Sequence, residues 1–137
     1  SNPRPQMIKV ADEPRVALIA DVETPLGEFT IATTHLSFVP GFNVKQLRKL
    51  TKQLSERSNP VLIFGDFNLP GKIANFVSRW DSLSELPTYP TMNPRIQFDH
   101  IIARGLSDEV VNQARNSAEV LQLPFSDHCA LVVEVTK

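Results

Sequence analysis

One run of residues, Val61-Leu62-Ile63-Phe64-Gly65-Asp66-Phe67-Asn68, constrains the fold of this chain more than any other stretch. Its four apolar residues predict a buried strand. Asp66 and Asn68 are two residues apart in extended chain, so both side chains are expected on the same side at the end of that strand. The alternative is a strand that ends in an Asx-type turn, which Asp and Asn favour. The run alone leaves both interpretations open.

The composition is that of one globular domain without a strong bulk charge. The chain has 137 residues, 42% of them hydrophobic and 21% charged, and its formal net charge is -1. It is therefore long enough to bury a core, and bulk charge does not draw it to nucleic acid or anionic membrane. No apolar run approaches membrane-spanning length, and no signal-peptide pattern is present. Cys129 is the only cysteine, so no internal disulfide can form, and we expect a cytoplasmic location.

The first fourteen residues differ from the rest of the chain. They are polar and proline-rich, which predicts a flexible or edge-lying lead-in. The chain begins Ser1-Asn2-Pro3 rather than with Met, which is typical of a cloning remnant and indicates an excerpt of a longer protein. We therefore expect a lead-in over residues 1–14 and one domain over residues 15–137.

Strand patterns dominate the domain. Residues 15–22 alternate, residues 28–34 are rich in β-branched side chains, and the turn residues between them predict a hairpin. Three further strands are expected at residues 97–103, 109–113 and 130–135.

Two helices are expected between the strands. Asn43 is expected to cap a helix that runs to about Arg57, and the buried stripe of this helix consists of Leu47, Leu50 and Leu54. Its other side carries Lys45, Arg48, Lys49 and Lys52. This basic side could meet phosphate, but an ordinary solvated face is the favoured interpretation. A short second helix is expected from Ile73 to Trp80, with Phe76, Val77 and Trp80 in the core.

Four short polar islands at strand ends or within strands hold all three histidines of the chain. They are Thr33-Thr34-His35-Leu36, Gly65-Asp66-Phe67-Asn68, Phe98-Asp99-His100-Ile101 and Ser126-Asp127-His128. A single His or Asp at such a place is usually structural, satisfied by nearby backbone groups. If the strands lie side by side, however, the four islands converge on one edge of the sheet.

The converging side chains would be carboxylates, an amide and imidazoles, without an activated serine or cysteine motif. This inventory favours metal-assisted hydrolysis of a phosphate ester. Hard oxygen ligands favour magnesium or manganese, and zinc is less attractive because no HExxH or CxxC spacing is present. Cys129 is interpreted as a small core residue.

Several motifs follow one another in order along residues 15–136. They are T-T-H-L-S at 33–37, a Leu-rich helix, P-V-L-I-F-G-D-F-N-L-P at 60–70, Y-P-T-M-N-P-R-I-Q-F-D-H-I-I at 89–102 and F-S-D-H-C-A-L-V-V at 125–133. This order resembles the endonuclease/exonuclease/phosphatase superfamily, which includes deoxyribonucleases, apurinic-site endonucleases, sphingomyelinases and inositol-phosphate phosphatases. The resemblance implies the α+β class and the deoxyribonuclease-like four-layer α/β/β/α sandwich. About its C-terminal half is expected here, as a mixed, mainly antiparallel sheet with flanking helices.

The resemblance also implies roles for individual residues. His35 would contact the scissile phosphate, Asp66 would orient or deprotonate the attacking water, and Asn68 would bind the phosphate. Asp99 would pair with His128, which would stabilise the transition state and assist the leaving oxygen. Asp127 would bind the metal, magnesium or manganese. Tyr89 and Arg95 would contact the substrate, and His100 would be structural.

The chain departs from the family pattern at its N-terminal side. The N-terminal half of the family fold carries an Asn on its first strand and a metal-binding Glu after its first helix. Asn2, Glu13, Glu23 and Glu28 lack the apolar strand and helix that would flank such residues. We therefore expect weak or absent metal binding and little activity from this chain alone.

The expected function is metal-dependent phosphoester hydrolysis on a substrate of unknown class. The expected partners are the missing N-terminal half of the parent domain and a second copy of the chain, either of which would cover an open sheet face. The alternative is a catalytically silent binding or scaffold module of the same fold. An unrelated strand-rich domain with coincidental motifs is the remaining rival, which the joint order of the motifs disfavours.

Overall fold

A six-stranded mixed sheet forms the centre of the molecule, in a computed structural model that describes residues 4–8 and 15–136. The strands are β1 (Arg4–Ile8), β2 (Arg15–Thr24), β3 (Gly27–His35), β4 (Val61–Asp66), β5 (Asp81–Ser82) and β6 (Asp99–Arg104), and their order in the sheet is β1-β2-β3-β4-β6-β5. The helices are α1 (Phe42–Leu54), α2 (Ile73–Ser78) and α3 (Asp108–Ser117). A separate two-stranded sheet consists of β7 (Glu119–Leu121) and β8 (Ala130–Val132). This is the expected mixed, mainly antiparallel sheet with flanking helices.

Strand β1 lies at the edge of the sheet, where it pairs antiparallel with β2. It falls within the proposed lead-in, of which residues 1–3 and 9–14 lie outside the described residues. The expected hairpin is present as β2 and β3, which pair antiparallel through Thr24 opposite Gly27.

The sheet register brings three of the polar islands to one place. Strands β3 and β4 run parallel, joined through α1, and His35 lies opposite Asp66. Strands β4 and β6 run antiparallel, and Asp66 lies opposite Asp99. Three neighbouring strands therefore present one site residue each at the same level of the sheet.

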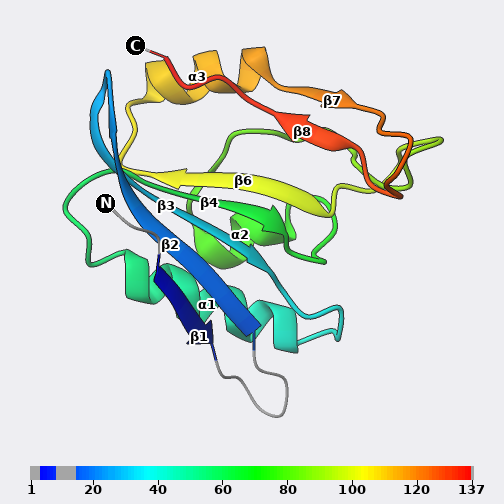
Figure 1. Ribbon diagram of the computed structural model, residues 1–137, viewed down its shortest axis with the longest axis horizontal. Coiled ribbons are helices and arrows are strands. Elements are labelled where there is room, and N and C mark those ends of the chain that lie inside the picture. The colour runs from blue at the N-terminus through cyan, green and yellow to red at the C-terminus, as the bar shows by residue number, and fades with distance from the viewer. Residues whose placement is uncertain (1–3, 9–14, 137) are drawn as a thin grey trace.

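Helices α1 and α2 cover one face of the sheet, and α3 lies on the other side together with β7 and β8 (Figure 1). The core under α1 joins its leucines to the inward side chains of the sheet: Leu47, Leu50, Leu54, Ala17, Ile19, Ala32, Val61, Ile63 and Ile102 are all buried. We call this side the helix face. These strand residues share one side of the sheet because residues two apart along a strand point to the same side.

The opposite side is only partly covered, and we call it the open face. A second core consists of Phe29, Leu62, Leu83, Ala103, Val111 and Ala114, with Val133 and Val135 packed against it. Beyond this core, Val16 and Leu18 of β2 remain 46% and 41% exposed. Apolar side chains of a sheet are thus left in solvent on this side.

Helix α1 differs from the sequence expectation at both ends. Gly41, with φ 89°, occupies the N-cap position without a side-chain cap, and the helix ends at Leu54. Asn43 therefore does not hold the N-cap position; its buried side chain accepts from the Val44 backbone N–H at 2.8 Å and donates to the Asn68 carbonyl oxygen at 3.0 Å.

Helix α2 is shorter than expected, and the prediction for one of its aromatic residues was wrong. Ala74 and Ser78, four residues apart on one side of the helix, are buried. Phe76 lies between them in sequence, so it points away from that side, and it is 81% exposed. Trp80 is buried and Val77 packs against the core, as expected.

The strand expected at residues 109–113 is wrong, since this segment belongs to α3. The Ser107 side chain caps the helix by accepting from the backbone N–H of Val110, and Asp108 and Glu109 lie in the first turn. Both features stabilise a helix start. Val111 and Ala114, three residues apart, are the buried residues of the helix.

In the described part of the chain, no helix is long and apolar enough to cross a membrane.

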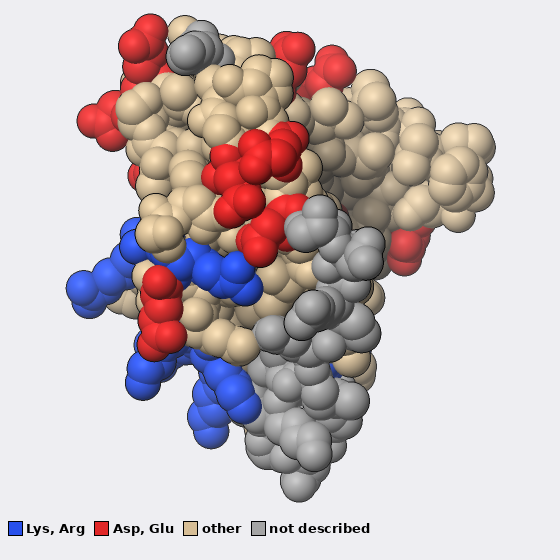
Figure 2. Space-filling view, turned by 60° about the vertical axis from the view of Figure 1, so that its left-hand side comes forward, with Lys and Arg blue, Asp and Glu red and all other residues tan. Residues whose placement is uncertain are grey.

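On the side drawn in Figure 2, acidic side chains lie together near the middle and basic ones below them. The basic side chains of α1, Lys45, Arg48, Lys49 and Lys52, are all exposed. Acidic atoms also lie among the basic ones in Figure 2, and Arg57 Nη1 is 3.2 Å from Asp21 Oδ1, so the two signs of charge are not fully separated.

Candidate active site

The end of β4 carries the first carboxylate of the site. Gly65, with φ 145°, precedes it, and any Cβ at that position would collide with the carbonyl oxygen of Thr34 on the neighbouring strand. Glycine is therefore required where β3 and β4 approach each other, immediately before Asp66.

Asp66 lies between two imidazoles. Its Oδ2 is 3.4 Å from His35 Nε2 and 3.7 Å from His128 Nε2. Its Oδ1 accepts a hydrogen bond of 2.9 Å from the backbone N–H of Asn68. One carboxylate oxygen is thus used to order the chain, and the other faces the histidines.

The Asp66–Asn68 segment is both a turn and part of a site. Asn68 has a left-handed backbone (φ 51°), which Asn tolerates better than most residues. Its Nδ2 donates to the carbonyl oxygen of Leu36 at 2.8 Å, so one amide N–H ties the loop after β3 and the other stays available. The two interpretations of the sequence are therefore compatible.

The expected hydrogen bond between Asp99 and His128 is present. His128 Nδ1 lies 2.6 Å from Asp99 Oδ2, and the fully buried Thr88 donates from Oγ1 to the same oxygen at 2.6 Å. The Asp99 backbone N–H donates back to Thr88 Oγ1 at 3.2 Å. This pairing fixes the ring of His128 with Nε2 directed toward Asp66.

The surroundings of His128 favour its protonated form. Partial burial of the imidazole lowers its pKa, but the Asp99 hydrogen bond and the negative charges of Asp99, Asp66 and Asp127 more than offset this, so the pKa lies above the ordinary value. A carboxylate on Nδ1 thus keeps a proton available on Nε2.

His100 follows Asp99 in sequence but belongs to the helix face. Burial lowers the pKa of this imidazole below the ordinary value, and its Nε2 lies 2.6 Å from the carbonyl oxygen of Leu69. A neutral ring can donate from Nε2 to that carbonyl, and it stacks on Phe67 with 5.2 Å between centroids. His100 is structural, as expected.

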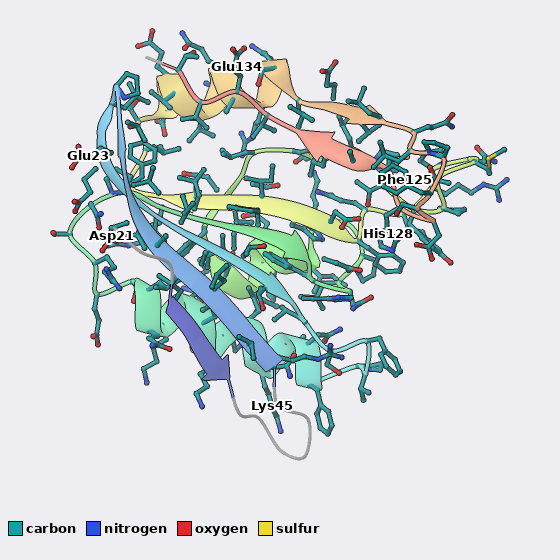
Figure 3. All side chains as sticks on the ribbon, in the orientation of Figure 1. Asp21, Glu23, Lys45, Phe125, His128 and Glu134 are labelled. Atoms are coloured by element: carbon teal, nitrogen blue, oxygen red, sulfur yellow. The ribbon has the colours of Figure 1, made fainter. Side chains whose placement is uncertain are left out.

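A cavity of about 470 Å³ joins these groups to solvent. It is lined by His35, Phe38, Asp66, Asn68, Tyr89, Phe98, Asp127 and His128. Figure 3 labels His128 at the end of the molecule where β4 ends and β6 begins. Six of the eight predicted site residues thus line one cavity, and Asp99 reaches it through His128.

Arg95 is the predicted site residue that the structure does not bring to this cavity. It lines a separate cavity of about 390 Å³, together with Lys72 and Glu85. With the Asn93 amide oriented so that its oxygen faces the guanidinium, that oxygen accepts from Arg95 Nη2 (2.9 Å) and Nε (3.2 Å).

Two polar residues of α1 that sequence reasoning missed hold the loops of the site. Asn43 Nδ2 donates to the Asn68 carbonyl oxygen at 3.0 Å, and the Ser37 backbone N–H donates to Gln46 Oε1 at 2.8 Å. Both side chains are buried, at 4% and 0% exposure. The signal available in the sequence was the position of two amides near the Leu47, Leu50 and Leu54 stripe.

The described acidic groups offer limited capacity for a cation. Asp66, Asp99 and His128 contribute atoms that lie within 4.8 Å of one another. Asp99 and His128 already share a short hydrogen bond, which a cation between them would have to replace. Asp127 is exposed and lines the same cavity, so its carboxylate oxygens are the accessible hard ligands.

The chain matches the Endonuclease/Exonuclease/phosphatase family over residues 10–128. It belongs to this family, whose members are hydrolases that include nucleases and phosphatases. A search of curated proteins gave no match.

Solved structures share the fold at low sequence identity. A functionally unknown conserved protein from Enterococcus faecalis V583 is 17% identical with a TM-score of 0.71, covering 98% of this chain and 65% of that one. The Bacteroides thetaiotaomicron mannosyl-6-phosphatase Bt3783 is 14% identical, with a TM-score of 0.68 and coverage of 99% and 66%. D. rerio TDP2, complexed with a single-strand DNA product, is 20% identical, with a TM-score of 0.61 and coverage of 78% and 53%. The chain thus spans less than two thirds of the length of each.

Proposed function

We propose that this chain is the C-terminal part of a metal-dependent phosphoesterase that hydrolyses a phosphodiester or phosphomonoester with an activated water. The observation that carries the proposal is the position of Asp66 Oδ2 between the imidazoles of His35 and His128, at 3.4 Å and 3.7 Å. A base and two proton donors around one small cavity are the groups that such a hydrolysis requires.

In this proposal Asp66 accepts the proton of the attacking water. The water oxygen forms a bond to phosphorus while the bond from phosphorus to the leaving oxygen breaks. His128 donates its Nε2 proton to that leaving oxygen, and Asp99 holds the cation in place. His35 and the free N–H of Asn68 donate hydrogen bonds to the non-bridging phosphate oxygens, whose charge grows in the transition state.

The metal assigned to this chemistry is magnesium or manganese, with Asp127 as ligand. When bound, it would offset negative charge on a phosphate oxygen. The exposed Asp127 fits a hard cation, but Asp66 and Asp99 are engaged with histidines. We therefore expect the chain by itself to bind magnesium weakly and to hydrolyse little or nothing.

Two further residues are proposed to contact substrate. Tyr89 lines the cavity beside His128. Arg95 would contact only a substrate that extends to the second cavity, which it lines with Lys72.

The proposed partners cover the open face of the sheet. They are the N-terminal half of the parent domain and, in its absence, a second copy of this chain, because Val16 and Leu18 are otherwise left in solvent. A cytoplasmic setting is part of the proposal, and the free and buried Cys129 is compatible with it.

The test compares this chain with a longer form that carries the N-terminal half. Each is assayed with phosphodiester and phosphomonoester panels in magnesium and in chelator. The longer form should turn over at least one substrate in magnesium, and Asp66→Ala should lower turnover by about 100-fold or more. Asp81→Ala, at an exposed position of β5, should leave turnover unchanged. A longer form that hydrolyses nothing, or an active Asp66→Ala variant, would contradict the proposal.

A catalytically silent binding module is the second candidate, favoured because, of the two carboxylates that line the cavity among the described residues, Asp66 already lies beside two histidines and only Asp127 is exposed. In that case the longer form would bind a phosphate ester without turnover in any divalent cation. Calorimetric binding combined with an absence of product separates it from the hydrolase.

A further inference from the structure

Three aromatic side chains line the cavity beside the polar groups, and the proposed chemistry of hydrolysis does not use them for proton transfer. They are Phe38, Tyr89 and Phe98. Tyr89 and Phe98 are half-buried, whereas Phe38 is 74% exposed. A large apolar side chain left in solvent at the mouth of a cavity is unfavourable unless a ligand covers it.

Tyr89 and Phe98 form a fixed wall next to His128. The Tyr89 ring centroid lies 5.5 Å from that of Phe98 and 5.0 Å from that of His128. The Tyr89 N–H donates to the Ile96 carbonyl and the Ile96 N–H to the Tyr89 carbonyl, at 3.1 Å and 3.0 Å. The wall therefore stands in place before any ligand arrives, directly beside the proposed proton donor.

The backbone before Phe38 is fixed as well. The Leu36 N–H donates to the Asp66 carbonyl at 2.9 Å, and the Ser37 N–H donates to buried Gln46 at 2.8 Å. Phe38 is thus presented from a tethered loop, although its own ring is left largely uncovered.

Recognition beyond the phosphate has few charged groups to use. Among the described residues that line the cavity, none is Lys or Arg. Its size, about 470 Å³, suits a small molecule, and the apolar surface that it offers consists of aromatic rings. Planar groups gain most from ring faces, because stacked or edge-to-face contacts add to the burial of area.

We propose that this cavity binds phosphate esters that carry a planar ring beside the phosphate, with Phe38 and the Tyr89–Phe98 wall as the ring contacts. The inference rests on the proposed phosphate site and adds the substrate class. Phe38 thereby selects the substrate, while Asp66 and His128 act on the phosphorus.

The test is a binding titration of the 137-residue chain in buffer with magnesium, followed by NMR of the histidine rings. The probes are phenylphosphonate, cyclohexylphosphonate, methylphosphonate and thymidine 5′-monophosphate. Phenylphosphonate should bind about tenfold more tightly than methylphosphonate and more tightly than the non-planar cyclohexyl probe. Phe38→Ala should weaken the ring-bearing probes about fivefold and leave methylphosphonate unchanged. Phe76→Ala, which removes a ring of similar exposure on α2 (81%, against 74% for Phe38), should change none of the affinities.

Each outcome separates the subsite from the phosphate site. Tightest binding of thymidine 5′-monophosphate, dependent on Phe38, would identify the ring as a nucleobase, and tightest binding of phenylphosphonate would identify an aryl group. Equal affinity for phenyl- and methylphosphonate, or equal weakening of both by Phe38→Ala, would overturn the subsite and leave the phosphate site intact. Absence of any response of His35 and His128 to all four probes would overturn the phosphate site and the subsite together.

Discussion

The two faces of the central sheet come from the same strands, yet one is closed and the other is not. On the helix face, Ala32, Val61 and Ile63 are fully buried. On the open face, Val16 and Leu18 are 46% and 41% exposed. Asp66 and Asp99 alternate with helix-face residues along β4 and β6, so their side chains point toward the open side. The closed face therefore holds the strands in register, and the open face carries the chemistry at its edge.

The consecutive residues Asp99 and His100 of β6 point to opposite faces, and they show why two histidines of this chain differ. Asp99 points to the site and binds His128 at 2.6 Å, whereas His100 is buried against Phe67 and Leu69. Neighbouring charges raise the pKa of His128, and burial lowers that of His100. The face on which a histidine lies, rather than its neighbours in sequence, decides whether it is available as a cation.

The largest expected effect is the difference in stability between the two faces. Leu50→Ala, at 1% exposure under α1, should lower the free energy of unfolding by about 2–5 kcal/mol, because it leaves a cavity in a packed core. Leu18→Ala on the open face should cost less than about 1 kcal/mol. Urea denaturation measures both. Equal losses would show that the open face is as well packed as the helix face.

The next effect concerns the polar contacts between the helix face and the site. Gln46→Leu removes the Oε1 that accepts from the buried Ser37 N–H, which should cost about 1–3 kcal/mol. It should also shift the NMR signals of His35, since the loop after β3 loses its tether. Lys52→Leu, on the exposed side of the same helix, is the matched control. Unchanged His35 signals in a destabilised Gln46→Leu variant would limit Gln46 to a packing role.

A smaller difference between the two faces is expected in self-association of the chain. If the open face is covered by a second copy, Leu18→Glu should raise the dissociation constant of the dimer about tenfold, because it places a charge in an apolar contact. Phe76→Glu replaces an equally apolar residue on α2 and should have no effect. Sedimentation or light scattering over a range of concentrations checks this. A monomer at the highest concentration would contradict the expected dimer.

The sheet and its polar edge were largely predictable from local patterns. Alternation gave β2, the β-branched residues gave β3, and the apolar run before Gly65 gave β4, because in each case tertiary packing agreed with local preference. The positions of the four polar islands predicted that they converge on one edge of the sheet, and residues of all four line one cavity.

The remaining features were missed either because a local signal was overlooked or because they depend on three-dimensional contacts. Segment 109–113 is apolar at Val110 and Val111, but the Ser107 cap and the two acidic residues that precede Val110 favour a helix. Phe76 was placed in the core by its hydrophobicity, although a six-residue helix can bury only one side. Arg95 lies on the same loop before Asp99 as Tyr89, yet it lines a different cavity. Asn43 and Gln46 acquire their roles only where α1 meets the two loops.

The smallest expected effect is the opposite pH dependence of the two histidines. The folded-state pKa of His128 lies above its unfolded value. Its stabilising contribution is therefore fully present below about pH 6.5, the ordinary value, and is lost as the pH rises through the folded-state pKa. The folded-state pKa of His100 is lowered, so this residue destabilises the protein as the pH falls below about 6.5.

Replacing Asp99, the hydrogen-bond partner of His128, should isolate the contribution of His128 to the pH dependence of stability. Asp99→Asn lowers the pKa of His128, because the ring loses its carboxylate partner. The wild-type chain should therefore gain stability over Asp99→Asn at mildly acidic pH, and this advantage should shrink as the pH rises, whereas Asp81→Asn on β5 should give no such trend. Histidine NMR titrations and urea denaturation across neutral pH measure both quantities. An unchanged His128 titration in Asp99→Asn would mean that the 2.6 Å contact does not hold the imidazole as a cation, and the proposed proton donor would lose its physical basis.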